Sequence, residues 1–372
     1  MQQDLKNLEI PLLSSYEKNY DFDFSQKIIK KFTKSKNIFV IGMGGSVLGT
    51  KCIYSFFKNR IKKKLFFIDN LDVNLHLELK KIKNLKKSCF IIVSKSGNTL
   101  ETLANFGIIF PKVILKKNLI IITEIKDSNL MNIANKYEAE VIEHNKDIGG
   151  RFSVLSEVGM FPAALMGLNI EKFKNLKKLI NNKSFTSALI KNVASIYTLR
   201  KKNIKNSVII NYSSNLNDLS FWYQQLVGES LGKKGKGITP IVSFGPKDHH
   251  SVLQLYLDGT KDKFFTFFQT FEKNNKYKVP KNIYTNQMKF LNNRSLQSII
   301  KAQANALKSI FKKKSIPFRE IIFSKNNEEE LGSIFTFFVL ETILLARLMH
   351  INPFDQPAVE QVKIETKKIL SI

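Results

Sequence analysis

Residues 37–49 read Asn37-Ile38-Phe39-Val40-Ile41-Gly42-Met43-Gly44-Gly45-Ser46-Val47-Leu48-Gly49, an apolar run that passes directly into a glycine-rich turn. The run predicts a buried strand, and the glycines can bring backbone N–H groups close to a phosphate or a sugar at a helix N-terminus. A dinucleotide fingerprint would have glycine at Val47, although Asp69 lies at about the spacing of a ribose-binding acid. The turn alone therefore leaves open a nicotinamide-dependent dehydrogenase, a sugar-phosphate site and a tight turn that binds nothing.

The same alternation of short apolar runs with amphipathic segments continues on both sides of this turn and indicates βα units that feed a parallel sheet. A helical stretch is expected over 154–180, and the polar residues that follow it suggest a link between domains near 181–205. The sequence thus predicts an α/β protein with two doubly wound parallel-sheet domains flanked by helices, 1–190 and 191–372. The expected strands are Asn37–Ile41, Lys64–Ile68, Cys89–Val93, Leu119–Thr123, Glu140–Ile142, Ser207–Asn211, Thr239–Ser243 and Phe264–Phe268.

Length and composition exclude several classes of protein. With 372 residues, 43% of them hydrophobic and 24% charged, the chain has the composition of a folded soluble protein rather than a disordered one. Two cysteines are too few for a disulfide framework and fit a reducing cytoplasm. The apolar stretch 334–351 contains Glu341 and Arg347, so we expect a buried helix rather than a membrane span. The first residues show no secretory signal, and the predicted location is cytoplasmic.

The net charge of +28 raises the question of a nucleic-acid partner. Only six of the 59 basic residues are arginine, however, and the lysines are spread along the chain in pairs and triplets. Base and bidentate phosphate readers favour the arginine fork. We therefore expect solvated lysine faces that help to attract an anionic substrate, and no nucleic-acid partner.

A second informative loop follows the predicted strand Cys89–Val93. It reads Ser94-Lys95-Ser96-Gly97-Asn98-Thr99 and leads into an apolar helix that starts near Leu100. Hydroxyls, one lysine and free N–H groups gather where a helix dipole favours an anion, which suits a phosphate monoester. Thr102, three residues after Thr99, can face the same way. The alternative is a capped helix with incidental hydroxyls.

Two further segments carry candidate catalytic side chains. Gly149-Gly150-Arg151-Phe152-Ser153 places one of the few arginines behind two glycines, where its guanidinium could meet developing negative charge or simply form a surface salt bridge. Glu229 lies in an otherwise apolar helical stretch, where burial would raise its pKa toward that of a general base. A salt-bridged helix residue is the alternative for Glu229.

Three polar side chains remain as candidates in the C-terminal half. His250 follows a turn rich in Gly, Pro and Asp, a suitable position for an acid or base, and the adjacent His249 lacks the further ligands of a metal site. Gln356 and Lys363 are seven residues apart, so they share one face if the final helix begins by Gln356. A solvated terminal helix is the other interpretation.

Taken together and in this order, these segments resemble the phosphoglucose isomerase family over nearly the whole chain, from Gly42 to Lys363. The most specific parts are residues 149–153, residues 225–233 with Glu229-Ser230-Leu231-Gly232-Lys233, and Asp355-Gln356-Pro357 with Val359, Glu360 and Lys363. The loops around Gly45-Ser46 and Ser94-Lys95-Ser96 are shared more widely among sugar isomerase domains, so they support the fold more than the reaction.

The resemblance implies two sugar isomerase domains, with the C-terminal helix completing the site, in a cytoplasmic homodimer without metal or organic cofactor. It implies the interconversion of glucose 6-phosphate and fructose 6-phosphate. Glu229 would be the base, Arg151 would stabilise the enediol-like intermediate, and His250 from the partner subunit would assist ring opening with Lys363. Substrate contacts would come from Gly45, Ser46, Ser94, Lys95, Ser96, Thr99, Thr102, Gly150 and Gln356.

Two departures from the family pattern carry expectations. Asn98 stands where we expect a threonine, which could alter the phosphate contacts, and the chain is short between Phe268 and Arg319, which bears on the dimer interface. A sugar-phosphate-binding regulator would use the same loops without Glu229, Arg151, His250 and Lys363. A dual isomerase that also accepts mannose 6-phosphate is the nearest alternative within the class, and Gln356 favours the narrower enzyme.

Overall fold

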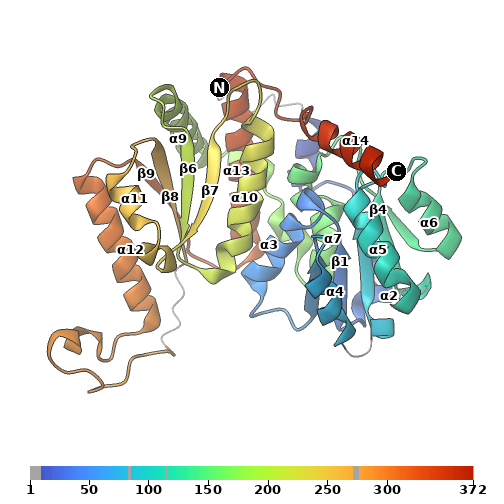
Figure 1. Ribbon diagram of the computed structural model, residues 1–372, viewed down its shortest axis with the longest axis horizontal. Helices are drawn as coiled ribbons and strands as arrows, with labels where there is room; N and C mark the ends of the chain where they lie inside the picture. Colours follow the sequence, from blue (N-terminus) through green and yellow to red (C-terminus); the bar gives the residue numbers. More distant parts are fainter. Residues whose placement is uncertain (1–9, 83–84, 114–115, 271–275, 372) are drawn as a thin grey trace.

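The computed structural model describes residues 10–82, 85–113, 116–270 and 276–371. Within them the chain forms two parallel sheets, each flanked by helices (Figure 1). The first sheet has the strand order β2-β1-β3-β4-β5 and the second the order β7-β6-β8-β9. Both orders place later strands on either side of the first strand of the sheet, which is the doubly wound arrangement that the sequence predicts.

The strands are β1 (Asn37–Ile41), β2 (Lys64–Ile68), β3 (Cys89–Val93), β4 (Leu119–Thr123), β5 (Glu140–Glu143), β6 (Asn206–Asn211), β7 (Thr239–Phe244), β8 (Lys263–Thr270) and β9 (Phe318–Phe323). The α-helices are α2 (Gln26–Thr33), α3 (Leu48–Phe57), α4 (Val73–Lys80), α5 (Leu100–Val113), α6 (Asn129–Tyr137), α7 (Glu157–Leu165), α8 (Leu176–Ile180), α9 (Lys183–Lys201), α10 (Asn217–Leu231), α11 (Leu253–Asp258), α12 (Leu296–Lys313), α13 (Glu328–Leu348) and α14 (Val359–Leu370).

The first sheet is buried on both faces because helices cover it on both sides. Every residue of β3 and of β4 is buried, and both strands are continuous apolar runs. Such runs are typical of parallel strands between two helical layers. The polar loops after the strands therefore lie at one edge, at the carboxyl ends, where the chain comes back to solvent.

All eight strands expected from the sequence are present with ends within two residues of the prediction. A ninth, β9, was not predicted and pairs in parallel with β8 at the edge of the second sheet. The continuous helical stretch expected over 154–180 is wrong. The structure has a 3-10 turn, η5 (Gly150–Leu155), then α7, a second turn and the short α8, and Gly167 interrupts the path with a φ of +84°.

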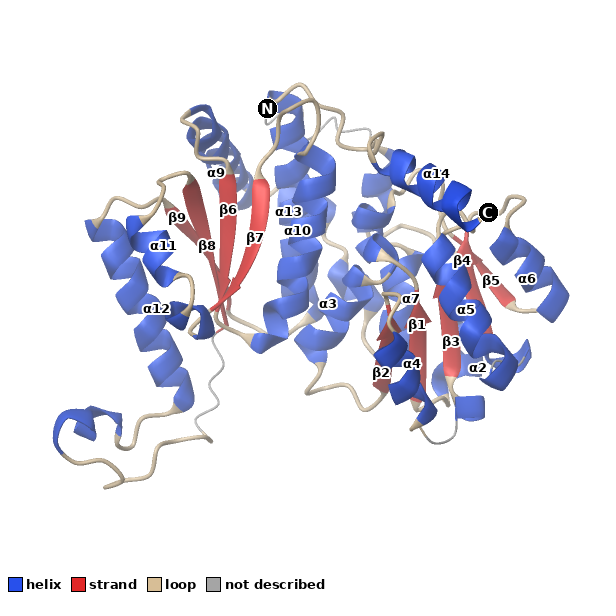
Figure 2. Cartoon of the chain, in the orientation of Figure 1, coloured by secondary structure: helices blue, strands red, loops and turns tan. Residues whose placement is uncertain are grey.

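The strands of the two sheets run in opposite directions in Figure 2, so their carboxyl edges face opposite ends of the molecule. Helix α10 starts at the carboxyl edge of the second sheet, just after β6, and returns along it. From Asn217 to Glu229 the helix rises about 18 Å at 1.5 Å per residue. The C-terminal end of α10 therefore lies on the side of the second sheet opposite to the carboxyl ends of its strands. This end is next to the first half of the chain.

One large apolar core cluster contains residues from Leu12 to Ile351, so both halves of the chain contribute to it. Helix α13, which contains most of the stretch 334–351, is the predicted buried helix. Among the described residues it is the helix that has the length and apolarity of a membrane span, and 72% of its apolar window is buried within the protein. The division at 190 and 191 stays a prediction, and α9 crosses that point as one helix.

Candidate active site

The turns after β1 and β3 flank the point where the order of the first sheet reverses. β1 pairs with β2 on one side and with β3 on the other, so the chain leaves these neighbouring strands in opposite directions. Such a switch point is where open parallel sheets bind ligands. Gly45 lies in the first turn, and a Cβ there would come within 2.2 Å of the Gly150 carbonyl carbon. Only glycine at position 45 permits this contact, which brings the Gly149–Arg151 segment to the switch point.

The loop after β3 presents hydroxyl groups at the start of α5. Ser94 Oγ and Thr99 Oγ1 are 2.8 Å apart, and Ser96 is exposed. Thr102 Oγ1 is buried and has no hydrogen-bond partner in the described part of the chain. Since an unpaired buried hydroxyl costs free energy, this group is ready to bond to a ligand. The structure thus gathers the predicted hydroxyls at one helix N-terminus.

Lys95 points its side chain away from this loop. Its Nζ donates to the Lys146 carbonyl at 2.7 Å and lies 3.7 Å from Glu124 Oε1. Burial lowers the pKa of Lys95, and the neighbouring Glu124 opposes that shift. The ammonium of Lys95 is therefore engaged by protein partners outside the loop.

Asn98, the departure from the family pattern, ties the loop to α6. Its Oδ1 accepts hydrogen bonds from both the backbone N and the Nδ2 of Asn129, each at 2.9 Å. The adjacent Gly97 has a φ of +69°, and a Cβ there would lie 2.3 Å from Ser128 Oγ. Ser128 is the N-cap of α6, and its side chain accepts from the backbone N of Met131. The loop is thus held against the start of a neighbouring helix.

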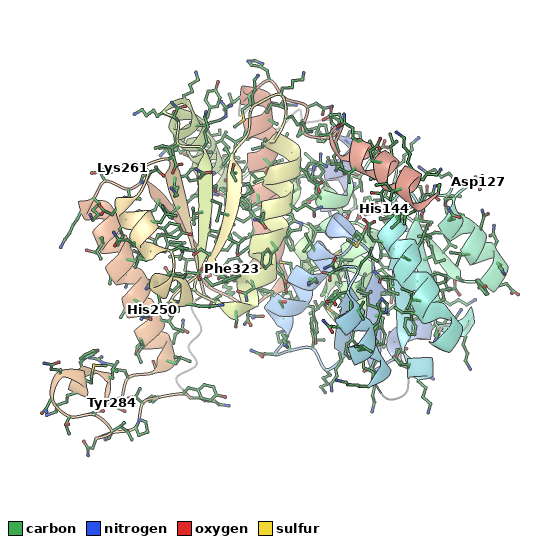
Figure 3. The ribbon with its side chains drawn as sticks, viewed as in Figure 1. Asp127, His144, His250, Lys261, Tyr284 and Phe323 are labelled. Atoms are coloured by element: carbon green, nitrogen blue, oxygen red, sulfur yellow. The ribbon has the colours of Figure 1, made fainter. Side chains whose placement is uncertain are left out.

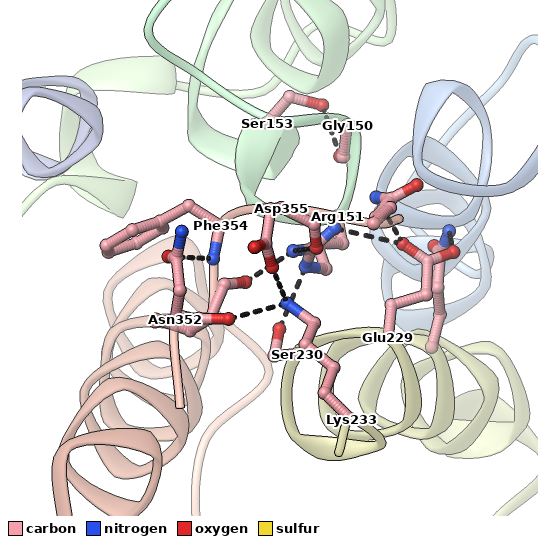
Figure 4. A network of polar contacts seen from close by, with 12 residues as sticks. Gly150, Arg151, Ser153, Glu229, Ser230, Lys233, Asn352, Phe354 and Asp355 are labelled. Atoms are coloured by element: carbon pink, nitrogen blue, oxygen red, sulfur yellow. Dashed lines mark hydrogen bonds and ion pairs between the residues drawn. The ribbon is translucent and has the colours of Figure 1, made fainter. Parts of the chain in front are cut away.

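Arg151 is the centre of the polar network in Figure 4. The side chain is 1% exposed, so it does not form the surface salt bridge that the sequence left open. Its Nε donates to Ser230 Oγ at 2.8 Å, its Nη1 to Glu229 Oε2 at 3.2 Å, and its Nη2 to the carbonyls of Pro353 and Asp355. Burial lowers the pKa of Arg151, and the Glu229 carboxylate partly restores it.

Glu229 receives hydrogen bonds at both carboxylate oxygens. Gln225 Nε2 donates to Oε1 at 2.8 Å, and Gln356 Nε2 donates to Oε2 at 2.9 Å. The side chain keeps 31% of its surface exposed, so Glu229 is only partly buried within its apolar helix. The contacts nevertheless fix the orientation of the carboxylate beside the guanidinium of Arg151.

Gln225 and Ser230 are site residues that the sequence analysis did not single out. Gln225 also lies against the first turn, because a Cβ at Gly44 would come within 2.7 Å of its Nε2, and its Oε1 is buried without a partner in the described part of the chain. The i, i+4 spacing of Gln225 and Glu229 places them on one helix face, and this signal could have identified Gln225. Ser230 lies in the family-like segment 229–233, but helix spacing alone gives it no role.

Two predicted catalytic side chains lie outside this network. His250 is exposed in the turn after β7, at the carboxyl edge of the second sheet (Figure 3), the edge opposite to the end of α10 that carries Glu229. Lys363 is exposed on α14 and pairs with Glu360 at 2.6 Å. Helix α14 begins at Val359 rather than by Gln356, so the shared helix face expected for Gln356 and Lys363 does not exist. The C-terminal segment contributes Gln356 to the network, while the helix itself does not reach it.

The described residues contain no cluster of three or more His, Cys, Asp or Glu side chains arranged to hold a metal ion. His249, which the sequence analysis set beside His250, bonds instead to the hydroxyl of Tyr212, with 2.6 Å between Nε2 and the phenolic oxygen. The side chains that the structure brings together at the site carry a carboxylate, a guanidinium, amides and hydroxyls.

Comparison with known proteins identifies the family. The phosphoglucose isomerase family model matches residues 23–371. The glucose-6-phosphate isomerase of Methanocaldococcus jannaschii is 35% identical over 349 residues, 90% of this chain and 84% of that protein. A hypothetical protein from Thermus thermophilus shares the fold with a TM-score of 0.88 at 24% identity, covering 100% of this chain and 94% of the other. For a glucose-6-phosphate isomerase from Chlamydia trachomatis the TM-score is 0.75 at 21% identity, with 93% and 72% covered. The chain belongs to the phosphoglucose isomerase family.

Proposed function

We propose that this enzyme interconverts glucose 6-phosphate and fructose 6-phosphate at the switch point of the first sheet, with Glu229 as the base. The observation that carries this assignment is the contact of a fixed carboxylate with a buried guanidinium, Glu229 with Arg151, beside a hydroxyl-rich helix N-terminus. An aldose–ketose interconversion needs a base for the carbon-bound proton and a cation for the oxygen that becomes negative. The site supplies both groups.

The proposed reaction moves one proton between two carbons. Glu229 removes the proton from C2 of the open-chain aldose, the electron pair forms the C1–C2 double bond of an enediol-like intermediate, and the same carboxyl group returns the proton to C1 to give the ketose. Arg151 stabilises the negative charge on the oxygen, and Gln225 and Gln356 hold the carboxylate in place. No atom is gained or lost, so the reaction needs no co-reactant.

The phosphate takes no part in bond making, and its binding energy holds the sugar for proton transfer. We assign it to Ser94, Ser96, Thr99, Thr102 and the Lys95 backbone. The sugar is assigned to Gly45 and Ser46 of the turn after β1 and to Gly150, which packs against Gly45.

The test of this function is the conversion of fructose 6-phosphate to glucose 6-phosphate by the purified protein in the presence of a chelator. Turnover is expected to persist with the chelator, and mannose 6-phosphate in a competition assay then separates the narrow enzyme from a dual isomerase. Tight phosphosugar binding without turnover would instead indicate a sugar-phosphate-binding regulator.

Replacing Asn98 with alanine is expected to raise KM for fructose 6-phosphate about three- to tenfold and to leave kcat within about twofold, because two hydrogen bonds that hold the phosphate loop are lost. Steady-state kinetics measure both constants. Asn129→Ala is the matched control: it removes the side-chain donor but keeps the backbone donor, so its KM should rise less. A fall in kcat at constant KM would contradict this role.

The homodimer and the role of His250 also remain proposals. Because His250 is exposed at the edge opposite to Glu229, it completes the site only if it comes from a partner subunit. An arm formed by residues 276–295 projects from the second sheet (Figure 1). Its exposed apolar side chains are available for contact with a second copy: Tyr277, Ile283, Tyr284, Met288 and Phe290. We assign ring opening to the partner's His250 together with Lys363, which must leave Glu360 to reach the sugar.

A cytoplasmic location likewise stays a prediction.

Mixing two inactive variants tests the shared site. If Glu229→Gln and His250→Asn subunits are dissociated and reassociated in equal amounts, about a quarter of wild-type activity is expected, because half of the dimers are hybrids with one complete site each. Each variant treated alone serves as the control. If activity does not reappear in hybrids verified by mass spectrometry, His250 does not act in the site of the partner subunit.

A further inference from the structure

The turn that carries Gln356 is fastened to the end of α10 by a single lysine. Lys233 Nζ donates to the Asn352 carbonyl at 2.6 Å and to Asp355 Oδ1 at 2.6 Å, and its side chain is only 9% exposed. Lys233 lies two residues beyond the last residue of α10, close in sequence to Glu229 and Ser230 (Figure 4). The contact therefore joins the helix that bears the base to the C-terminal segment.

The same turn supplies partners to both catalytic side chains. The carbonyls of Pro353 and Asp355 accept from Arg151 Nη2, and Gln356 Nε2 donates to Glu229 Oε2. Of the three side chains in the described part of the chain that donate to the Glu229 carboxylate, Gln356 belongs to the turn and Arg151 is held by it. Movement of the turn would thus change the positions of the base and of the cation together.

Lys233 also separates two competing carboxylates. The charge of Asp355 acts on Arg151 and raises the pKa of the guanidinium, as Glu229 does. The Asp355 carboxylate is held by its ion pair with Lys233. The Nη1 group of Arg151 is therefore left for Glu229 to bind. Without the ammonium, Asp355 would compete with Glu229 for Arg151.

We propose that Lys233 is a positioning residue for the isomerase reaction, acting through the turn of residues 352–356 on Glu229 and Arg151. This inference rests on the proposed function for the identity of the base. It predicts an effect on the chemical step rather than on phosphosugar binding, because Lys233 contacts none of the residues assigned to the phosphate. Small displacements of a catalytic group cost rate steeply.

The test is a set of kinetic variants compared with the wild-type enzyme. Lys233→Met is expected to lower kcat about ten- to hundredfold with KM for fructose 6-phosphate within about threefold, and Lys233→Arg to recover most of the loss. Lys236 is the matched control, since it lies on the same loop and donates to one carbonyl, that of Met349 at 2.8 Å. Lys236→Met should keep kcat within about twofold of wild type.

Three results would overturn the proposal: an unchanged kcat in Lys233→Met, an equal loss in Lys236→Met, or a Lys233→Arg variant no better than the methionine. Asp355→Asn carries the test if Lys233→Met fails to fold, because it weakens the ion pair and keeps the contact with the Asn352 carbonyl. A several-fold lower kcat is expected for it, and wild-type kcat would again overturn the proposal. Wild-type turnover in the same assay tests the proposed function separately.

Discussion

Replacing Glu229 with glutamine is expected to lower turnover at least about a thousandfold while phosphosugar affinity stays within a few fold. The amide has nearly the same shape as the carboxylate and keeps an oxygen that can accept from Arg151 and Gln356, but it cannot accept the carbon-bound proton. Steady-state kinetics give the loss of kcat, and titration calorimetry with fructose 6-phosphate gives the affinity.

A second glutamate provides the control for this experiment. Glu329 pairs with Lys178 on the surface, with 51% of its side chain exposed, and Glu329→Gln should leave both kcat and affinity unchanged. If phosphosugar affinity collapsed in Glu229→Gln, the residue would be structural. If turnover persisted, another group would be the base.

Replacing Arg151 with alanine is expected to lower kcat by roughly 10²–10³, on the order of 3–4 kcal/mol of barrier, as for the loss of one oxyanion donor in other enzymes. The guanidinium also fills a buried position with four hydrogen-bond partners, so the free energy of unfolding should fall as well. Kinetics and thermal denaturation, measured together, separate the two effects.

Arg151→Lys keeps the charge and loses the planar fork, so we expect its activity to lie between that of wild type and that of Arg151→Ala. Arg60, which is 45% exposed and pairs with the buried Glu328 away from the site, is the control position, and Arg60→Ala should retain full kcat. A kcat of wild-type size in a folded Arg151→Ala enzyme would remove the guanidinium from the mechanism.

The strands of both sheets could be predicted where an apolar run is continuous, and β9 shows why this criterion failed once. Arg319 and Glu320 interrupt the pattern Phe318–Phe323. Arg319 is nevertheless accommodated, because it donates to Thr266 Oγ1 at 2.9 Å and to Tyr223 Oη at 3.0 Å and pairs with the buried Glu341. A charged residue whose partners lie far along the chain looks, in the sequence, like the end of a strand.

The condition for a shared face, a helix that begins by Gln356, is not met for a local reason. The residue before a proline is disfavoured in the α region, so Gln356, which precedes Pro357, stays outside the helix that begins at Val359. Gln356 is thereby free to turn toward Glu229, while Lys363 remains on the helix surface. Pro357 is visible in the sequence, so the later start of the helix could have been predicted from it.

The loops of the site could be located from the sequence because each directly follows a predicted strand, as Gly42–Val47 and Ser94–Thr99 do. The contacts that hold the site together could not be predicted from the sequence. Lys233 and Asp355 are 122 residues apart, and Asn98 and Asn129 are 31 residues apart with α5 and β4 between them in the chain. Such pairs depend on tertiary packing, which one sequence taken alone does not reveal.

The separation of Arg151 from its carbonyl partners has a consequence during synthesis. The Pro353 carbonyl that accepts from Nη2 lies 202 residues further along the chain. At about 5–20 residues per second a ribosome takes roughly 10–40 s to cover that distance, and domains fold from the N-terminus onward meanwhile. Glu229 is made 78 residues after Arg151, but the Pro353 carbonyl is made only at the end of this interval. The first sheet can therefore be complete before the arginine has all its partners, and the catalytic site is completed late in synthesis.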